Sequence, residues 1–527
     1  MPDYDTAIEA IVALSGAPAL SYTIVQHGKP IQTRHLGYRN VEALIKPNDD
    51  TIYGINSMTK AMVAALAAII ASQGLIDLDD PVAKHLPDFK CLDPELTEKV
   101  TIADFLSHRS GLANNNRWSG TFDELTISKA DALAVLATAQ TAMPLRAGFK
   151  YNNWGYEVVG QLLEHVTGES FADLLGKYLF IPLGMSRSST RHDPDDDNTV
   201  SSYGVLSDKS AFPQQHTQMA PGTIMEAAGA MRTTITDLIK LYTSFLHALR
   251  HQTETGSNST PGSPFINTRA LTAAQIPWPG SFPHEQSYAF GWARTCLPGQ
   301  LGLSSINSSL CDPAEPSTAV IPIIGAGTNT LAIHHNGSMG ASTSCVILLP
   351  EHDAFVVALC NAMTPVDVPD LACEHLVQAF LGCEEQNDFV ALTRTLFGRG
   401  VGYMDKIKAE LESKRIKGTK PKDLDEYTGT YLDRSGILSI VVAQKSDGLV
   451  IMRNGQEDDQ VSLTHYQNDS FTAWRSFDEL MKGALMFPEP AEYYVYKFGC
   501  NGDGGWIDEV RWRRDSDVPD VVYTKKN

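Results

Sequence analysis

The sequence predicts an α+β protein, in which a helical region interrupts the strands of an antiparallel sheet and a small all-β domain follows. Three observations lead to this prediction. Residues 5–15 have a helical pattern, and residues 19–40 alternate apolar and polar side chains around a His-Gly-Lys-Pro turn, which indicates a β-hairpin. Residues 329–362 contain further strands of the buried type, and a helix follows at 369–382. From about residue 421 the chain consists of short alternating strands separated by turn residues.

The helical region between the strands contains five segments with apolar residues at helical spacing: 57–73, 101–113, 129–140, 154–168 and 233–249. Gly74 and Gly168 would end two of them, since glycine is common just past a helix C-terminus. The last segment begins with Thr-x-x-Asp, which is similar to a capping box. The segment 57–73 is apolar on all sides, so we expect a buried central helix.

Two irregular stretches follow the helical region. Residues 250–264 are rich in Gly, Ser, Thr and Pro, which predicts a surface loop. Residues 296–327 have no regular pattern and lie between two predicted strands. We expect the two stretches to form a lid or one wall of a pocket; the alternative is a surface insertion without a role in the site.

The composition is that of an ordinary globular protein. The 527 residues are 43% hydrophobic and 20% charged, and the net charge is −20. This acidic excess argues against a nucleic acid or an anionic membrane as partner, because both bind basic patches. The eight cysteines include no Cys-x-x-Cys pair, so we expect neither a disulfide framework nor a cysteine zinc site.

The N-terminal segment does not have the pattern of a signal peptide, because no basic residues precede its apolar ones. The longest apolar run, residues 61–71, is too short to cross a bilayer. We therefore expect a cytoplasmic protein.

The first candidate for chemistry is a Ser-x-x-Lys at the start of the apolar segment, formed by Ser57 and Lys60. This spacing puts both side chains on one face of a helix, one turn apart. The free N–H groups of a helix N-terminus can stabilise an oxyanion, and a lysine beside a serine can help to ionise its hydroxyl. Taken alone, the motif is also consistent with a serine that is merely favoured at a helix start.

A second candidate is the Tyr-x-Asn formed by Tyr151 and Asn153, just before a predicted helix. A phenolate near Lys60 could act as a general base, since a neighbouring ammonium favours the ionised phenol. The Asn153 amide can orient a substrate carbonyl because it offers both a donor and an acceptor.

The third candidate is the segment His335-Asn336-Gly337-Ser338 at the start of a predicted strand. A glycine there would let the backbone approach a ligand, and the Ser338 amide could supply a second oxyanion donor. The adjacent His334 and His335 have no partner motif for a metal, so we expect no metal site and no cofactor.

Together these motifs resemble the serine β-lactamase and penicillin-binding-protein superfamily, most closely its class C-like esterase and transesterase branch. The residues that match its three motifs, in the same order along the chain, are Ser57 and Lys60, Tyr151 and Asn153, and His335 and Gly337. The resemblance covers roughly residues 5–380. It implies a β-lactamase/transpeptidase-like serine hydrolase domain over residues 1–383, then a helical linker over 384–420 and a C-terminal β-barrel-like domain over 421–527.

The resemblance also implies a mechanism. Ser57 attacks a carbonyl and forms an acyl-enzyme, while Tyr151, coupled to Lys60, takes the serine proton and passes it to the leaving group. The amides of Ser57 and Ser338 hold the oxyanion. Water, or another alcohol, amine or thiol, then accepts the acyl group.

The sequence departs from many β-lactamases in having His335 where they have lysine. Histidine is mostly neutral near pH 7, so the demand for an anionic group on the substrate is weaker. We therefore expect a serine hydrolase for a small ester or amide. Trp118 and Trp292 are aromatic candidates for the pocket walls, as are Trp154 and Tyr288, although core packing is the alternative for each.

Two alternatives stay open at this point. One is an acyltransferase that moves an acyl group from a thioester to an alcohol or amine in natural-product biosynthesis, with an acyl-carrier partner. The other is a non-catalytic binding protein on the same fold. An α/β-hydrolase is disfavoured because no Gly-x-Ser-x-Gly occurs in the chain. The acyl group, the acceptor and the oligomeric state do not follow from the sequence.

Overall fold

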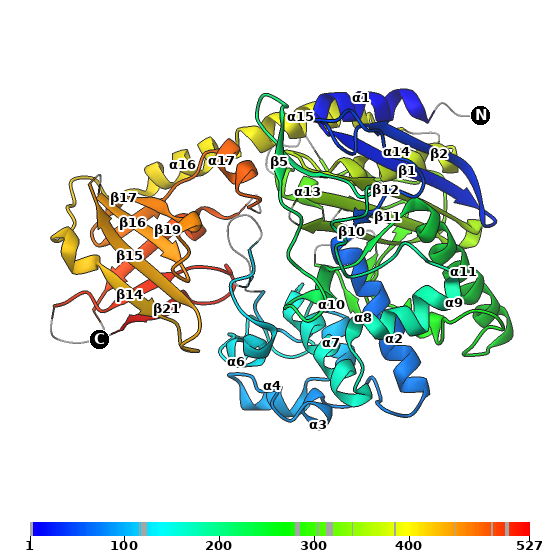
Figure 1. Ribbon diagram of the computed structural model, residues 1–527, viewed down its shortest axis with the longest axis horizontal. Helices are drawn as coiled ribbons and strands as arrows, with labels where there is room; N and C mark the ends of the chain where they lie inside the picture. Colours follow the sequence, from blue (N-terminus) through cyan, green and yellow to red (C-terminus); the bar gives the residue numbers. More distant parts are fainter. Residues whose placement is uncertain are drawn as a thin grey trace.

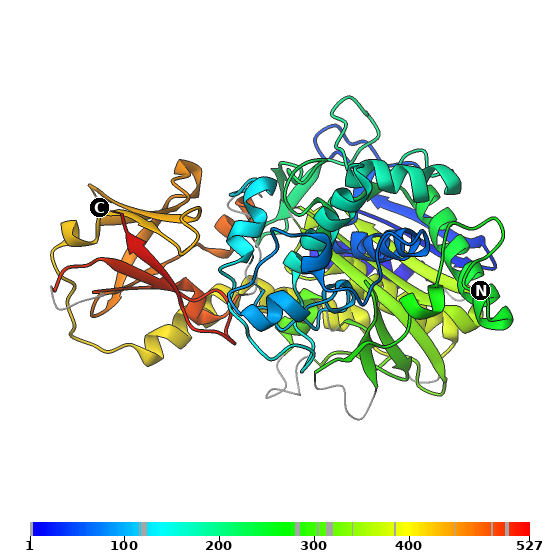
Figure 2. The ribbon, with the colours of Figure 1, turned by 90° about the horizontal axis from the view of Figure 1, so that it is seen from below.

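The structure is a computed structural model that describes residues 4–526 except 115, 117, 119–123, 280–284, 303–304, 312–319, 340, 384–385, 447, 486–488 and 501–504. It consists of a large body built on one sheet and a barrel that stands at one end of the molecule (Figure 1 and Figure 2). No helix in the described ranges is both long and apolar enough to cross a membrane.

The body is organised around an eight-stranded sheet in which all neighbouring strands run antiparallel. From one edge to the other its strands are β2 (Lys29–Gly37), β1 (Ala19–Gln26), β12 (Ala354–Cys360), β11 (Ser342–Leu349), β10 (Thr330–Met339), β9 (Ala293–Leu297), β8 (Gln286–Tyr288) and β7 (Ile276–Pro277). The predicted hairpin is thus β1–β2, and the predicted buried strands are β10 to β12.

Helices cover both faces of this sheet, which is why β11 and β12 are buried along their whole length. Val346 and Leu348 of β11 face the cluster that contains α2 (Thr59–Ser72) and α11 (Ile235–Thr255). The alternate residues Cys345 and Ile347 face α1 (Asp5–Ser15), α14 (Val368–Leu381) and α15 (Phe389–Val401). Side chains alternate between the faces of a strand, so an unbroken apolar run fits a sheet that is covered on both sides.

The helical region lies against the first of these faces. Its helices and 3-10 turns are η1 (Asn56–Met58), α2, α3 (Val82–His85), α4 (Pro94–Lys99), α5 (Ile102–Leu106), η3 (Lys129–Asp131), α6 (Ala132–Leu136), α7 (Asn153–Thr167), α8 (Phe171–Leu175), α9 (Ile181–Leu183), α10 (Glu226–Gly229), α11 and α12 (Thr268–Leu271). Every residue of α2 from Thr59 to Ile70 is buried, as expected of a helix that is apolar on all sides.

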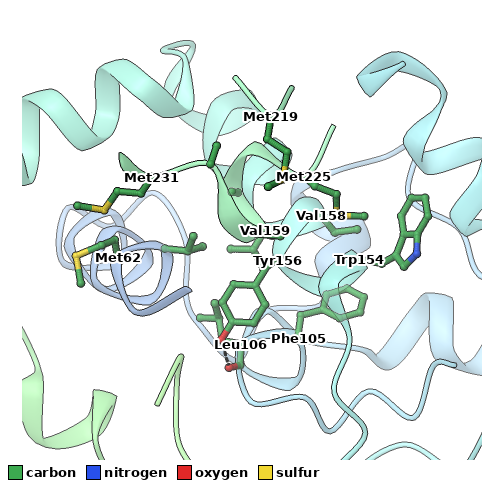
Figure 3. Packing of buried hydrophobic residues seen from close by; sticks show 14 of the residues in the cluster. Met62, Phe105, Leu106, Trp154, Tyr156, Val158, Val159, Met219, Met225 and Met231 are labelled. Carbon is green, nitrogen blue, oxygen red and sulfur yellow. Dashed lines mark hydrogen bonds between the residues drawn. The ribbon is translucent and has the colours of Figure 1, made fainter. Parts of the chain in front are cut away.

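Helix α7 packs beside α2 and α10 at the centre of this region (Figure 3). Met62, Tyr156 and Met225 belong to one buried cluster there. The buried Tyr156 hydroxyl donates a hydrogen bond to the Leu106 carbonyl at 2.6 Å, so its polar end is satisfied within the core. The packing holds the N-terminal ends of α2 and α7 in fixed positions.

The C-terminal part is a closed barrel of eight strands. They are β14 (Gly429–Leu432), β15 (Ser439–Lys445), β16 (Gly448–Arg453), β17 (Val461–Gln467), β18 (Ser470–Ala473), β19 (Val495–Gly499), β20 (Glu509–Trp512) and β21 (Val521–Lys525), with β21 pairing β14. Closure leaves no free strand edge. The α+β body and the separate all-β domain therefore agree with the predicted fold class.

The stretch between body and barrel contains α15 and α16 (Tyr403–Lys414). Because α15 packs against α1 and α14, much of the predicted linker belongs to the body. Helix α11 continues to Thr255, so the predicted loop 250–264 begins several residues later than expected. Of the stretch 296–327, residues 303–304 and 312–319 lie outside the described residues, while α13 (Ile306–Leu310) is helical.

Candidate active site

Ser57 lies in the turn η1, directly before the central helix α2. The preceding Asn56 has a φ of 48°, which asparagine tolerates, and its side-chain amide donates to the Ser342 carbonyl and hydroxyl, each at 3.0 Å. Strand β11 thereby fixes the turn. This local geometry, which the helical pattern does not predict, separates Ser57 from the regular helix.

Ser57, Lys60 and Tyr151 meet at this turn. Lys60 Nζ lies 2.9 Å from Ser57 Oγ, and Tyr151 Oη lies 3.0 Å from the same atom. Lys60 Nζ also donates to the Ala228 carbonyl at 2.8 Å. The Ser57 hydroxyl is thus within hydrogen-bond distance of an amine and a phenol at once.

Burial pushes the pKa values of these two partners in opposite directions. The Lys60 side chain has no exposed surface, and this desolvation lowers its pKa well below the usual 10.5. Desolvation raises the pKa of Tyr151, with a smaller opposing effect from its hydrogen bond to Ser57. Burial thus disfavours the charged form of both groups, which opposes the expected pair of an ammonium at Lys60 and a phenolate at Tyr151.

His335 lies on β10 and is neutral. Its Nδ1 lies 2.6 Å from the Asn336 carbonyl, which can only accept, so Nδ1 carries the proton. Nε2 then accepts from the Tyr288 hydroxyl at 2.9 Å. Burial, with a smaller effect of Lys60, lowers the pKa of His335 to about 3. No cation stands at this position near pH 7.

Gly337 permits the close approach of β10 to the segment that carries Ser57. A Cβ at this position would lie 2.1 Å from the Ile55 carbonyl oxygen and 2.4 Å from Ser344 Oγ. Ser344 Oγ itself donates to the Ile55 carbonyl at 2.9 Å. The glycine is therefore required by contact with the protein's own backbone. The sequence predicts a different reason for this glycine, namely that it lets the backbone approach a ligand.

A cavity of about 310 Å³ opens beside Ser57. The predicted residues that line it are Ser57, Tyr151, Asn153, His335, Asn336, Ser338 and Trp118. The Asn153 amide donates to Asn116 Oδ1 at 3.2 Å, and Trp118 Nε1 donates to the same oxygen at 3.2 Å. The Asn336 amide donates to Asp370 at 2.9 Å. The roles of the Ser57 and Ser338 amides as oxyanion donors stay predictions.

Three of the predicted aromatic residues, Trp154, Tyr288 and Trp292, do not line this cavity. Trp292 is 1% exposed and packs with Tyr242 and Phe245 in the hydrophobic core. Trp154 is buried in the same core. No residue of 250–264 lines the cavity in the described part of the chain, whereas Ile306, in the stretch 296–327, does.

Several residues of the site have no signal in the sequence. Phe149 and Trp278, stacked at 4.3 Å, form an aromatic wall together with Trp118. Asp367, the N-cap of α14, also lines the cavity. Periodicity cannot single out these residues, since they come from loops that are far apart along the chain.

His108 lies beneath Tyr151, with 4.2 Å between the ring centroids. Its Nδ1 accepts a hydrogen bond from the backbone N–H of Asn152 at 3.0 Å, so its proton is on Nε2. Burial, together with Lys60 and His335, lowers its pKa well below the usual range. The Tyr151 ring therefore rests on a neutral imidazole.

The chain belongs to the β-lactamase family, since the family model described as Beta-lactamase matches residues 5–379. This membership supports a serine hydrolase that works through an acyl-enzyme, of the type found in β-lactamases and penicillin-binding proteins. A second model, Domain of unknown function (DUF3471), matches residues 413–513 in the barrel part of the chain.

Curated relatives are similar over a part of the chain. The protein flp of Staphylococcus aureus is 29% identical over 189 residues, which are 35% of this chain and 37% of that protein. Penicillin-binding protein 4 of Amycolatopsis lactamdurans is 33% identical over 142 residues, 27% of this chain and 36% of that protein. The chain thus spans little more than a third of the length of these relatives.

Solved structures share the fold at low sequence identity. The octameric penicillin-binding protein homologue from Pyrococcus abyssi has a TM-score of 0.57 and 19% identity, and the match covers 99% of each chain. A class C β-lactamase from Rhodobacter sphaeroides has a TM-score of 0.55 and 18% identity, over 72% of this chain and 99% of that one. The first match therefore includes the barrel as well as the body.

Proposed function

We propose that the protein is a serine hydrolase that cleaves a small-molecule ester, and less readily an amide, through an acyl-enzyme on Ser57. One observation carries the proposal: Ser57 Oγ lies within 3.0 Å of both the buried Lys60 amine and the Tyr151 phenol. Burial lowers the pKa of Lys60, and the neutral form of its amine can act as a general base at this distance. A non-catalytic binding protein would not require a buried lysine in this position.

In acylation, Lys60 Nζ takes the proton of Ser57 while Oγ forms a bond to the substrate carbonyl carbon. The electron pair of the carbonyl moves to its oxygen, where the amides of Ser57 and Ser338 would stabilise it. The bond to the leaving oxygen then breaks, and that oxygen takes a proton from Tyr151, which regains one from Lys60. In deacylation, water takes the place of Ser57 as the attacking group and Ser57 Oγ becomes the leaving oxygen, so the free acid is released.

The cavity favours a substrate that is uncharged next to the scissile carbonyl. Among the described residues that line it there is no lysine or arginine, and His335 is neutral. Asp367 is the acidic residue on its wall, and burial raises the pKa of that carboxyl well above its ordinary value. A carboxylate beside the carbonyl, as in penicillin-type substrates, would find no cation there.

The test is intact-mass spectrometry with a panel of aryl esters, thioesters and a chromogenic cephalosporin. A transient adduct on the wild type that is absent from Ser57→Ala is expected, and aryl esters should turn over faster than the cephalosporin. Ser72→Ala, at the far end of α2, is the matched control and should form the same adduct. No adduct with any compound would refute the proposal.

Adding a small alcohol or thiol to the same reactions separates hydrolysis from acyl transfer. A free acid as the dominant product supports the hydrolase, and a new ester or thioester as the dominant product would favour the acyltransferase. The partners would then be a thioester donor and a small acceptor instead of water.

A further inference from the structure

The end of the barrel that faces the body has a basic lining. A cavity of about 120 Å³ opens there, and Ile451, Arg453, Ala473, Arg475, Trp512 and Arg514 line it from the barrel. The six residues form three pairs, 451 and 453, 473 and 475, and 512 and 514. The members of each pair are two positions apart, at or just after the ends of β16, β18 and β20. Arg453 is the last residue of β16, and Arg475 and Arg514 follow two residues after the ends of β18 and β20, so three of the eight strands lead to an arginine at this cavity.

Two of the three arginines share one carboxylate. Asp459, 2% exposed, forms ion pairs with Arg453 and, at 3.3 Å, with Arg475. One carboxylate therefore faces two guanidinium groups, and the group carries a net positive charge. The simplest alternative, in which the arginines only close the end of the barrel, accounts for this triad.

That alternative does not account for Arg514. Its guanidinium lies 4.6 Å from the ring centroid of Trp512 and 5.6 Å from that of Tyr493. In the part of the chain that the structure describes, its buried Nε has no hydrogen-bond acceptor. The acid that faces it is Glu489, whose pKa is raised by burial, with a smaller opposing effect of Arg514. A buried donor left without an acceptor is costly, and a ligand anion would relieve this cost.

The barrel cavity adjoins the catalytic cavity. Asn116 and Met339 line both of them. Hydrogen bonds also join the barrel part of the chain to the catalytic walls: Asp515 accepts from the Asn114 amide at 2.9 Å and from Lys150 Nζ at 2.8 Å. Lys150 immediately precedes Tyr151. A substrate held at Ser57 can therefore extend past Asn116 toward the arginines.

We propose that the mouth of the barrel binds an anionic group, a carboxylate or a phosphate, at the end of the substrate remote from the scissile carbonyl. This inference rests on the proposed function, because it places the reacting end of the same molecule at Ser57. It also joins two properties of the site: the surroundings of Ser57 accept an uncharged group, and the barrel mouth accepts a charged one. The length between the carbonyl and the anion then becomes a determinant of specificity.

The kinetic test uses p-nitrophenyl monoesters of α,ω-dicarboxylic acids of four to ten carbons, each beside a neutral twin that carries a methyl ester at the far end. At one length, kcat/KM for the anionic ester should exceed that of its twin by about 10-fold to 100-fold, as expected for a charge-assisted hydrogen bond. Arg514→Met should bring this ratio close to one. Arg511→Met is the matched control and should keep it, since Arg511 lies on the exposed side of β20 and pairs with Glu509 at 2.7 Å.

A binding measurement keeps this inference separate from the proposed hydrolysis. Calorimetric titration of Ser57→Ala with adipate and with butyl phosphate reports the anion site without turnover, and the tighter of the two identifies the chemistry. Binding that is lost on adding Arg514→Met supports the anion site even if no ester is hydrolysed, in which case the proposed function alone fails. A ratio near one at every length together with no binding of either anion would overturn the inference.

Discussion

The contact between Gly337 and the Ile55 carbonyl offers a direct test of how the strand β10 positions the nucleophile. In Gly337→Ala the added methyl group would lie 2.1 Å from that oxygen, whereas real contacts of this kind are essentially never shorter than 3.0 Å. The two segments must therefore separate by about 1 Å. Ile55 is two residues before Ser57, so the shift moves Ser57 Oγ relative to β10.

A misplacement of about 1 Å can reduce the rate by about 100-fold, and overpacking of this kind destabilises a protein by about 1–3 kcal/mol. The assay is the second-order rate constant for labelling of Ser57 by a fluorophosphonate, together with kcat/KM for an aryl ester, measured well below the melting temperature of the variant. Gly398→Ala is the control, because a Cβ there meets nothing within 4 Å on the exposed side of α15. Labelling of Gly337→Ala within threefold of wild type would refute the argument.

Three further predictions follow from the same contacts. The pKa of Lys60 is well below its usual 10.5, and that of Tyr151 is raised. We therefore expect kcat/KM to be level from neutral pH to about pH 10. A tenfold rise per pH unit between pH 8 and 9.5 would contradict a neutral Lys60. Asp515→Ala removes the acceptor of a part-buried backbone amide and of Lys150, and it should lower the free energy of unfolding by about 1–3 kcal/mol. Asp517→Ala removes a carboxylate that is 57% exposed, so it should lower this free energy by less than about 1 kcal/mol; equal losses in thermal unfolding would contradict the difference. Burial lowers the pKa of His334 to about 4, whereas its pKa in the unfolded chain is about 6.5. The contribution of His334 to the free energy of unfolding is therefore complete above about pH 6.5 and falls by about 2 kcal/mol as the pH drops to about 5. His334→Gln should flatten this dependence of the unfolding free energy on pH, and an unchanged slope would contradict the prediction.

Much of the fold follows from local patterns. The helix predicted at 5–15 is α1, and the His-Gly-Lys-Pro turn joins β1 to β2. The Thr-x-x-Asp signal is present as predicted, since the Thr234 hydroxyl accepts from the Asp237 amide at the start of α11. Such features depend on contacts within a few residues, and residue type and spacing are enough to predict them.

The sequence patterns are less informative about where a helix ends and which residues line the cavity. The polar residues after 250 predicted a loop, but α11 continues to Thr255 because its buried face, which includes Gln252, still packs on the body. Trp292 and Trp278 are both aromatic residues next to strands of one sheet, yet the first is core and the second lines the cavity. Which of them meets the substrate depends on the face of the sheet to which each side chain points and on what covers that face.

The sequence by itself determined which groups take part: a serine and a lysine one turn apart, a tyrosine before a helix and a histidine-glycine pair on a strand, in an order that identifies the superfamily. It also determined that α2 is buried, since a helix that is apolar on all sides has no face for water. Only the tertiary structure decided in which direction the pKa values of Lys60, Tyr151 and His335 shift, because desolvation depends on neighbours that are far away in the chain. The same reason applies to the barrel, whose position beside the catalytic cavity follows from packing alone.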